Sequence, residues 1–369
     1  MDDAMSNAES NPLFLEYCCP RCKGPLASAV EKYTCTACAA HFPVVLGIPD
    51  FRVFSDPYLS IADDHRKGAR IAERAAAGAS FEELVRYYWS ITPDEPPEMA
   101  ERFTALAVAA AERGRDLLKA QPRVDAILRR STPARVLDVG SRTGGLLLAA
   151  AERAPEVVGI DIAFRWLIVA RKRLEGVGRP AQLVCCCAEF LPFKPGSFDV
   201  VVAENVLEHT ARQQDLIEEA HRVLMPGGVF FATTWNRLAA APEPHVRLWG
   251  VGWLPLAQRQ RYVKWRKGVS YDHVRLLSVF QLRRMVRHTS FGCCAIKLPE
   301  FSEAQLASVS VGQRAVVNVY HRIKNWPVIR GLLLLVAPVF HVVCVRRSNM
   351  AADIVQPPPA TERNSSSGR

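Results

Sequence analysis

The feature that most constrains the fold of this 369-residue chain is an alternation of short apolar runs with helical patterns between residues 131 and 236. Buried strands that alternate with helices form a parallel sheet covered on both faces. We therefore expect an α/β fold. The expected strands lie at 134–139, 157–161, 181–185, 198–203 and 229–234, and helices are expected at 164–174 and 213–224.

A glycine-rich turn follows the first of these runs, with Gly140, Gly144 and Gly145 where strand meets helix. Glycine lets the chain turn sharply and approach a ligand, and the helix N-terminus behind it favours a carboxylate or phosphate. Asp161 stands twenty-one residues after Gly140, at the end of the second run. A carboxylate there can accept hydrogen bonds from both ribose hydroxyls. The pattern predicts a nucleotide-type ligand, although a tight turn without a ligand stays open.

Six motifs occur in a fixed order along this part of the chain. They are the turn at 136–145, Asp161, and the segments at 188–193, 197–200, 206–209 and 222–228. Together they resemble the class I S-adenosylmethionine (SAM)-dependent methyltransferases of the type 11 kind, within the broad group that includes quinone-biosynthesis enzymes. The alternative is an NAD-binding dehydrogenase.

The resemblance covers residues 131–236 as motifs and extends to 348 as architecture. It implies a Rossmann-like sheet of seven strands, whose last strand, near 340–345, inserts antiparallel beside the fifth, with a covering helix at 328–335.

The resemblance also implies roles for single residues. Asp138 and Gly140 would hold the methionine end of SAM, and Asp161 would bind the ribose. Ile162 would pack on the adenine, and the backbone of Ala188 would reach its edge. The residues expected to bind the cofactor are Asp138, Gly140, Ser141, Arg142, Gly144, Asp161, Ile162, Ala188, Glu189 and Asn205.

Two positions depart from the family pattern. Arg142 stands where glycine is usual, and its side chain would crowd the cofactor unless it pairs with the SAM carboxylate. Cys187 stands where aspartate is usual, so the adenine amino group loses an acceptor. A methyltransferase-like fold without activity therefore stays open.

Methyl transfer from a sulfonium mainly requires alignment and exclusion of water, but an oxygen nucleophile also needs a proton acceptor. The expected catalytic residues are Glu204, Glu208 and His209, although His209 has a purely packed alternative. Some quinone and RNA-end methyltransferases carry Glu-x-x-Glu-His as a divalent-cation site. Here Asn205 replaces the first glutamate, so that set is incomplete. The Asn/Asp-Pro-Pro-Tyr/Phe signature of amino-group methyltransferases is absent, which argues against methylation of a base amine.

Two Cys-x2-Cys pairs near the N-terminus, Cys19 with Cys22 and Cys35 with Cys38, are separated by twelve residues. Four thiolates on two tight turns can close a tetrahedral zinc site, and the metal would supply folding energy that forty residues lack. A redox or disulfide pair is the alternative, and Cys18 competes with Cys19 as a ligand.

The sequence flanking these cysteines carries a second resemblance. Phe-Pro-Val at 42–44 and Gly-Ile-Pro at 47–49 make this segment similar to the short zinc-ribbon protein that partners several tRNA and translation-factor methyltransferases. The resemblance implies a structural or docking ribbon.

The formal net charge of +10 is concentrated between residues 245 and 290, which hold ten Lys or Arg residues and one acid, Asp272. Trp249, Trp253, Tyr262 and Trp265 are interleaved with these cations. We expect a basic lid that meets an anionic membrane or substrate. Contact with RNA phosphates, or a solvated lid with inward aromatics, stays open.

The location expected for this protein follows from its cysteines and its apolar segments. An odd number of cysteines and the lack of a signal peptide favour a reducing cytoplasm over a disulfide scaffold, and the uncharged stretch at 331–345 is too short to span a membrane. We therefore expect a cytoplasmic protein, with peripheral membrane contact.

The organisation expected along the chain has five parts. The parts are a disordered tail at 1–12, a zinc ribbon at 13–53, a helical connector at 54–130 with helices at 81–89 and 99–118, the methyltransferase domain at 131–348 with strands at 294–298 and 339–345, and a disordered tail at 349–369.

The function expected from these observations is SAM-dependent methylation of oxygen or carbon on a small-molecule or lipid-like substrate. The first alternative is an RNA methyltransferase, because the order of ribbon and Rossmann-like domain resembles the ribosomal RNA guanine-N1 methyltransferases. Their zinc set usually ends in histidine, whereas this one has four cysteines. The second alternative is a non-catalytic SAM-fold module whose ribbon docks a partner.

Overall fold

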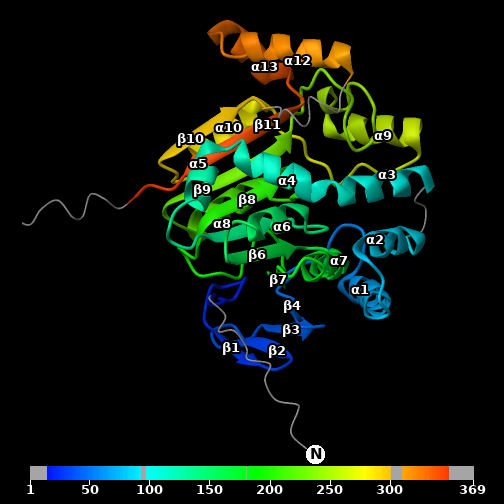
Figure 1. The fold of residues 1–369 in the computed structure, drawn as a ribbon, viewed down its shortest axis with the longest axis vertical. Helices are drawn as coiled ribbons and strands as arrows, with labels where there is room; N and C mark the ends of the chain where they lie inside the picture. Colours follow the sequence, from blue (N-terminus) through cyan, green and yellow to red (C-terminus); the bar gives the residue numbers. More distant parts are fainter. Residues whose placement is uncertain (1–14, 93–96, 180, 301–309, 349–369) are drawn as a thin grey trace, which may run out of the picture.

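The computed structural model describes residues 15–92, 97–179, 181–300 and 310–348. The expected tails at 1–12 and 349–369 lie outside the described residues. Within the described residues the chain forms a small four-stranded antiparallel sheet and a seven-stranded mixed sheet, shown in Figure 1.

The large sheet has the strand order β10-β11-β9-β8-β5-β6-β7. Strands β5 to β9 pair in parallel, and β11 runs antiparallel to both β9 and β10. This confirms the predicted α/β fold with a Rossmann-like seven-stranded sheet. The strands are β5 (Arg135–Val139), β6 (Glu156–Asp161), β7 (Gln182–Cys185), β8 (Phe198–Glu204), β9 (Leu224–Trp235), β10 (Cys293–Lys297) and β11 (Val339–Val345).

Strand β9 begins at Leu224, five residues before the predicted start at 229. The prediction was wrong there because Pro226, Gly227 and Gly228 are residues that usually interrupt a strand. The structure accommodates them as a bulge, since the pairing register of β9 with β8 shifts between Phe198 and Val200.

Helices cover both faces of the large sheet, so adjacent strand residues enter different cores. In β5, Val136 joins one hydrophobic cluster and Leu137 the other. The helices on the Val136 side are α5 (Pro122–Leu128), α6 (Gly145–Ala151) and α7 (Phe164–Glu175), and those on the Leu137 side include α8 (Gln213–Val223) and α10 (Val279–Arg287).

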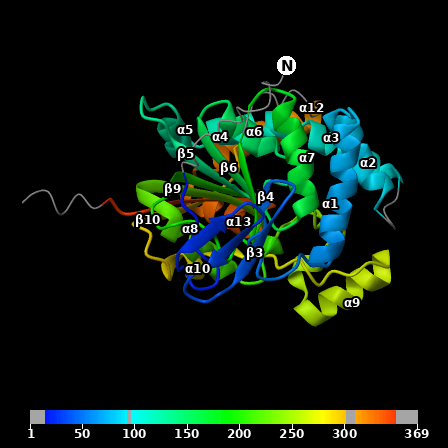
Figure 2. The same ribbon diagram turned by 90° about the horizontal axis from the view of Figure 1, so that it is seen from below.

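The segment expected as a connector forms an outer helical layer on this sheet. Figure 2 shows α1 lying along α7, and α4 packs on α6 so closely that a Cβ on Gly114 would lie 2.9 Å from the Cα of Leu146. The single helix expected at 99–118 is two helices, and Arg113 donates to the carbonyl of Leu106 near the break. The helices are α1 (Ile61–Ala76), α2 (Phe81–Ser90), α3 (Pro97–Val108) and α4 (Ala110–Lys119).

The small N-terminal sheet shares its core with the large sheet. Phe42 of β3, with Tyr17 and Phe51 that flank the sheet in sequence, belongs to the same buried cluster as Leu137. The backbone N–H of Phe51 donates to the carbonyl of Cys185 at the end of β7, so the ribbon lies against that edge (Figure 1). The strands are β1 (Leu26–Ala29), β2 (Lys32–Cys35), β3 (His41–Val45) and β4 (Ile48–Pro49).

The basic segment divides into two parts in the structure. The short helix η2 (Val251–Trp253) and α9 (Leu256–Lys267) form a lid with a small core of its own that includes Val251 and Val263, whereas α10 packs on the sheet. We call residues 236–277 the lid.

The C-terminal part returns to the large sheet. Helices α12 (Val311–Ile323) and α13 (Pro327–Val336) precede β11, and Leu334 of α13 is buried, in agreement with the helix expected at 328–335. A disulfide joins Cys294 to Cys344 across the paired strands β10 and β11. Among the described residues, no helix is long and apolar enough to cross a bilayer.

We expect Phe51→Ala to lower the free energy of unfolding by about 3–5 kcal/mol, because this fully buried ring packs on Tyr17, Tyr33 and Phe42. Val30→Ala in the same ribbon is the control, since Val30 is 95% exposed and its loss should cost under about 0.5 kcal/mol. Urea unfolding measures both. Equal effects of the two substitutions would contradict the shared core.

Candidate active site

The glycine turn after β5 is fixed to the end of β6. The backbone N–H groups of Gly140 and Ser141 both donate to the carbonyl of Ile160, at 2.8 and 2.9 Å. Gly140 has a φ of +74°, and a Cβ there would lie 2.5 Å from a methyl group of Val206. Gly144 also has a φ of +74°, directly before α6. Only glycine fits the position of residue 140 without displacing its neighbour.

Asp161 ends β6 beside this turn, and its carboxylate is held by backbone groups. Its Oδ2 accepts from the N–H of Arg142 and its Oδ1 from the N–H of Ala163, each at 2.8 Å. Burial raises the pKa of Asp161, while these two hydrogen bonds act in the opposite direction. The side chain is therefore fixed in place with capacity left for further donors.

Asp138, at the carboxyl end of β5, has a buried oxygen without a partner. Its side chain is 2% exposed, and Oδ2 has no hydrogen-bond partner among the described residues. Burial, reinforced by the negative charges of Glu204 and Asp161, raises the pKa of Asp138 to about 8. An unpaired buried carboxyl oxygen fits a cationic ligand group such as the amino group of SAM, whose positive charge would favour the ionised form of Asp138.

The structure shows the surroundings of Arg142 and Cys187, the two positions that depart from the family pattern. Arg142 has a φ of +49° and an exposed side chain, and its charge opposes the rise in the pKa of Glu204 that burial causes. Cys187 is buried, and its thiol donates to the carbonyl of Phe54 at 3.6 Å. The thiol at this position is therefore bonded to the segment that follows the ribbon.

Three other predicted cofactor residues use their side chains to hold loops. Ser141 Oγ donates to a backbone carbonyl of β5 at 3.0 Å, and Glu189 accepts from two backbone N–H groups that follow η1 (Leu207–His209). The Asn205 side chain accepts from Thr233 of β9. Ile162 and Ala188 are partly buried near the same edge of the sheet.

The three predicted catalytic residues fall into two groups. Glu204 ends β8 and lies near Asp138, whose pKa it helps to raise. Glu208 and His209 instead meet His245 of the lid, with potential ligand atoms all within 4.8 Å of one another. The Nε2 atoms of His209 and His245 are 3.1 Å apart. This Glu-His-His cluster has the ligand types of a metal site and equally those of a proton-transfer pair.

Burial and neighbouring charges set the protonation of this cluster. Glu208 is fully buried, accepts from Thr234 at 2.8 Å, and has a second oxygen without a partner among the described residues. Burial raises the pKa of Glu208 to about 7. Restricted hydration, His245 and Arg142 lower the pKa of His209 to about 3, although its side chain is exposed at the surface of the described structure. His209 is therefore neutral at pH 7 and, taken alone, a weak base.

Sequence reasoning missed His245 and its partner Glu243. The Glu243 carboxylate bonds His245 Nδ1 and also accepts from two backbone N–H groups of the lid. A lone histidine 36 positions after His209 carries no local signal, and only the folded lid brings the two together.

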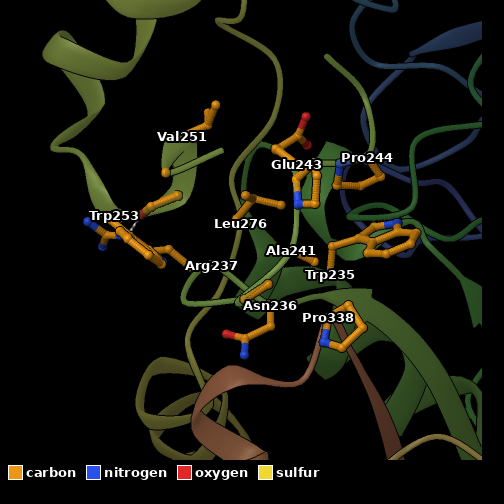
Figure 3. A pocket seen from close by; sticks show the side chains of 14 residues that line it. Trp235, Asn236, Arg237, Ala241, Glu243, Pro244, Val251, Trp253, Leu276 and Pro338 are labelled. Atoms are coloured by element: carbon orange, nitrogen blue, oxygen red, sulfur yellow. Dashed lines mark hydrogen bonds between the residues drawn. The ribbon is translucent and has the colours of Figure 1, made fainter. Parts of the chain in front are cut away.

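A small hollow lies between the lid and the ends of β9 and β11, and Figure 3 shows the residues around it. Trp235, Glu243 and Leu276 are among its lining residues. Its volume of about 10 Å³ holds one water molecule at most, so this hollow does not hold a substrate.

The four ribbon cysteines converge as the sequence predicts. The Sγ atoms of Cys19 and Cys38 are 3.7 Å apart and those of Cys22 and Cys35 are 3.5 Å apart. Four sulfurs around zinc at about 2.3 Å would be about 3.8 Å from one another. Cys18 points elsewhere, because its thiol donates to the carbonyl of Phe193.

Comparison with known proteins gives the same picture. Residues 137–232 match the family described as a methyltransferase domain. The chain is 37% identical over 139 residues to the ubiquinone biosynthesis O-methyltransferase of Idiomarina loihiensis, covering 35% of this chain and 56% of that protein. It is 38% identical over 117 residues to the demethylmenaquinone methyltransferase of Thermus thermophilus, covering 31% and 53%.

The match to a further relative extends over a larger share of that relative's length. The ubiquinone biosynthesis O-methyltransferase of a Methylobacterium species is 30% identical over 191 residues, covering 48% of this chain and 70% of that protein. The chain spans only about half the length of the first two relatives.

We expect Asp138→Asn to change how stability depends on pH. The folded pKa is about 8 and the unfolded value near 3.9. Below pH 4 both states hold the proton, so the wild type keeps its full stability. As the pH rises from about 4 to 8 the unfolded chain ionises first, and the wild type loses up to roughly 6 kcal/mol of stability relative to the variant. Urea unfolding from pH 4 to 9 measures the difference, and a constant difference would contradict the buried neutral carboxyl.

Proposed function

We propose that this chain, which belongs to the class I SAM-dependent methyltransferases, transfers the methyl group of SAM to an oxygen or carbon atom of a small-molecule or lipid-like substrate. The observation that carries the proposal is the edge formed by Asp138, Gly140 and Asp161. It offers an unpaired buried carboxyl oxygen, a turn that only glycine fits, and a fixed carboxylate.

SAM supplies an electrophilic methyl group on sulfur, and the residues of this chain hold and orient it. Asp138 would receive the amino group, the Gly140 turn would let the carboxylate approach, and Asp161 would accept from the ribose hydroxyls. The exposed guanidinium of Arg142 can pair with the carboxylate of SAM.

For an oxygen nucleophile, His209 is the proton acceptor that we propose. Although it is a weak base alone, its Nε2 lies 3.1 Å from Nε2 of His245, whose Nδ1 is bonded to Glu243, so a proton accepted by His209 can be shared along this pair. Glu208 is the buried member of this cluster, and Glu204 lies near Asp138, whose pKa its charge helps to raise. A divalent cation held by Glu208, His209 and His245 is the competing use of these side chains.

The substrate class rests on the relatives, whose names are those of quinone-biosynthesis enzymes. One is an O-methyltransferase and the other acts on demethylmenaquinone, so we propose a quinone-like aromatic ring as the acceptor. RNA methylation and SAM-fold binding without catalysis are the alternatives that the assay below separates.

The direct assay is transfer of radiolabelled methyl from SAM to lipid, metabolite, RNA and protein fractions of a cell extract. We expect label in the lipid or metabolite fraction, lost in Asp161→Ala because the ribose acceptor is gone. His209→Ala should lower kcat by about 10²-fold or more and leave the affinity for SAM unchanged. Label in RNA, or none in any fraction, would contradict the proposal. Loss of wild-type activity with EDTA, restored by Mg²⁺, would assign the cluster to a cation instead.

We also propose that the four-cysteine cluster holds a structural zinc ion, as its sulfur spacing supports. We expect one zinc per chain in the wild type, none in Cys19→Ser, and a lower melting temperature after chelation. Cys18→Ser is the matched control and should keep zinc, because that thiol faces Phe193. Elemental analysis and thermal unfolding decide, and a metal-free Cys18→Ser protein would reject this ligand set.

The exposed face of α9 supports peripheral contact with an anionic membrane. Trp265 is 76% exposed, and Arg261, Lys264, Arg266 and Lys267 are exposed around it. Arg259, expected to join this face, is buried in the lid instead. A surface that combines cations with an exposed tryptophan suits an interface with anionic lipid headgroups.

Replacement of these four cations by glutamine should weaken binding to phosphatidylserine-containing vesicles at least about tenfold. Replacing Arg283, Arg284 and Arg287, the exposed cations of α10, is the control and should have a smaller effect. Vesicle co-sedimentation measures both. Unchanged vesicle binding with lost RNA binding would instead favour the RNA alternative.

A further inference from the structure

Five buried charged side chains join the N-terminal segment to the loop that follows β6. Two arginines pair with three aspartates, and each side chain is at most 5% exposed. Buried charges are costly unless every one keeps its partners, so such a cluster strongly favours one arrangement. Its members are Asp50, Arg52, Asp56, Asp64 and Arg165.

Asp64 of α1 caps the N-terminus of α7. Its Oδ2 accepts from the backbone N–H of Phe164 at 2.8 Å, and its Oδ1 accepts from that of Arg165 at 3.2 Å. The residue at the cap position of α7 itself is Ala163, which has no side chain able to do this. A carboxylate at this place satisfies free N–H groups and interacts favourably with the helix dipole. Asp64 therefore fixes where α7 begins.

Arg52 ties the same loop to the ribbon. Its Nη1 donates to Asp64 at 2.7 Å and to the carbonyl of Ile162 at 3.0 Å, while its Nε holds Asp50 at 2.9 Å. The backbone of Asp50 forms a parallel β-bridge with that of Cys185 at the end of β7. One guanidinium thus connects the Ile162 carbonyl, α1 and the edge against which the ribbon lies.

The turn at 161–164 is consequently held from two directions. Arg52 and Asp64 bind its backbone at residues 162 and 164. The carboxylate of Asp161 accepts from the Gly140 turn through the N–H of Arg142. If the first set of bonds is lost, the turn is free to move relative to the glycine turn, and the Asp161 carboxylate moves with it.

We propose that Arg52 and Asp64 are positioning residues for the nucleoside half of SAM and act through the turn at 161–164. The inference rests on the proposed function, because it requires SAM at this edge. It gives the N-terminal segment a part in cofactor affinity. A cluster that served only the stability of the fold would leave the affinity of the folded protein unchanged.

The experiment is calorimetric titration of the full chain with SAM and, separately, with 5′-methylthioadenosine, which has the nucleoside without the amino-acid half. The variants are Asp64→Asn, which keeps size but loses one acceptor, and the milder Arg52→Lys, which keeps charge but loses the fork. Asp125→Asn is the matched control, since that carboxylate accepts from Arg129 and Arg153 and not from the turn at 161–164. Circular dichroism establishes that each protein is folded at the titration temperature.

We expect each variant to weaken the binding of SAM and of 5′-methylthioadenosine by the same factor, at least about tenfold, because the turn would be correctly placed in only about a tenth of the molecules. Asp125→Asn should bind both as the wild type does, and Asp138→Asn should weaken SAM more than 5′-methylthioadenosine. Wild-type affinities in folded Arg52→Lys and Asp64→Asn would overturn the proposal, as would weakening of SAM alone. A wild type that binds neither compound would refute the proposed function itself, which separates the two failures.

Discussion

Two backbone N–H groups that share one carbonyl define the geometry of this protein's functional edge. Gly140 and Ser141 both donate to Ile160, which joins the turn after β5 to the last residues of β6. Because β5 and β6 are parallel neighbours, their carboxyl ends meet there, and Asp138 and Asp161 lie on either side of the junction. The sharp turn requires the positive φ of Gly140 and leaves no room for a Cβ beside Val206.

The ribbon is part of the same construction rather than an appendage. Tyr17, Phe42 and Phe51 lie in the core that covers one face of the large sheet, and Phe51 bonds to the end of β7. A separate forty-residue module would have little core of its own. Here the converging cysteines lie partly within that shared core, and the last residues of the ribbon lead directly into the buried cluster of Arg52 and Asp64.

Local sequence patterns predicted the elements that depend on residues close to one another in the sequence. The apolar runs gave the five parallel strands, and the Cys-x2-Cys spacing gave the convergent sulfurs. The pairing of His209 with His245 was beyond reach, since it depends on how the lid folds back over η1. The cap of α7 by Asp64 was hidden for the same reason, because one hundred positions separate Asp64 from Phe164. Contacts of that range leave no periodicity in the sequence.

The central claim is that SAM lies across the ends of β5 and β6. A crystal structure of the full chain with S-adenosylhomocysteine tests it most directly. We predict the ribose hydroxyls within hydrogen-bonding distance of the Asp161 carboxylate and the amino group beside Oδ2 of Asp138. We also predict the adenine between Ile162 and the segment at 187–188. Density for the ligand at another place, or none at saturating concentration, would contradict the account.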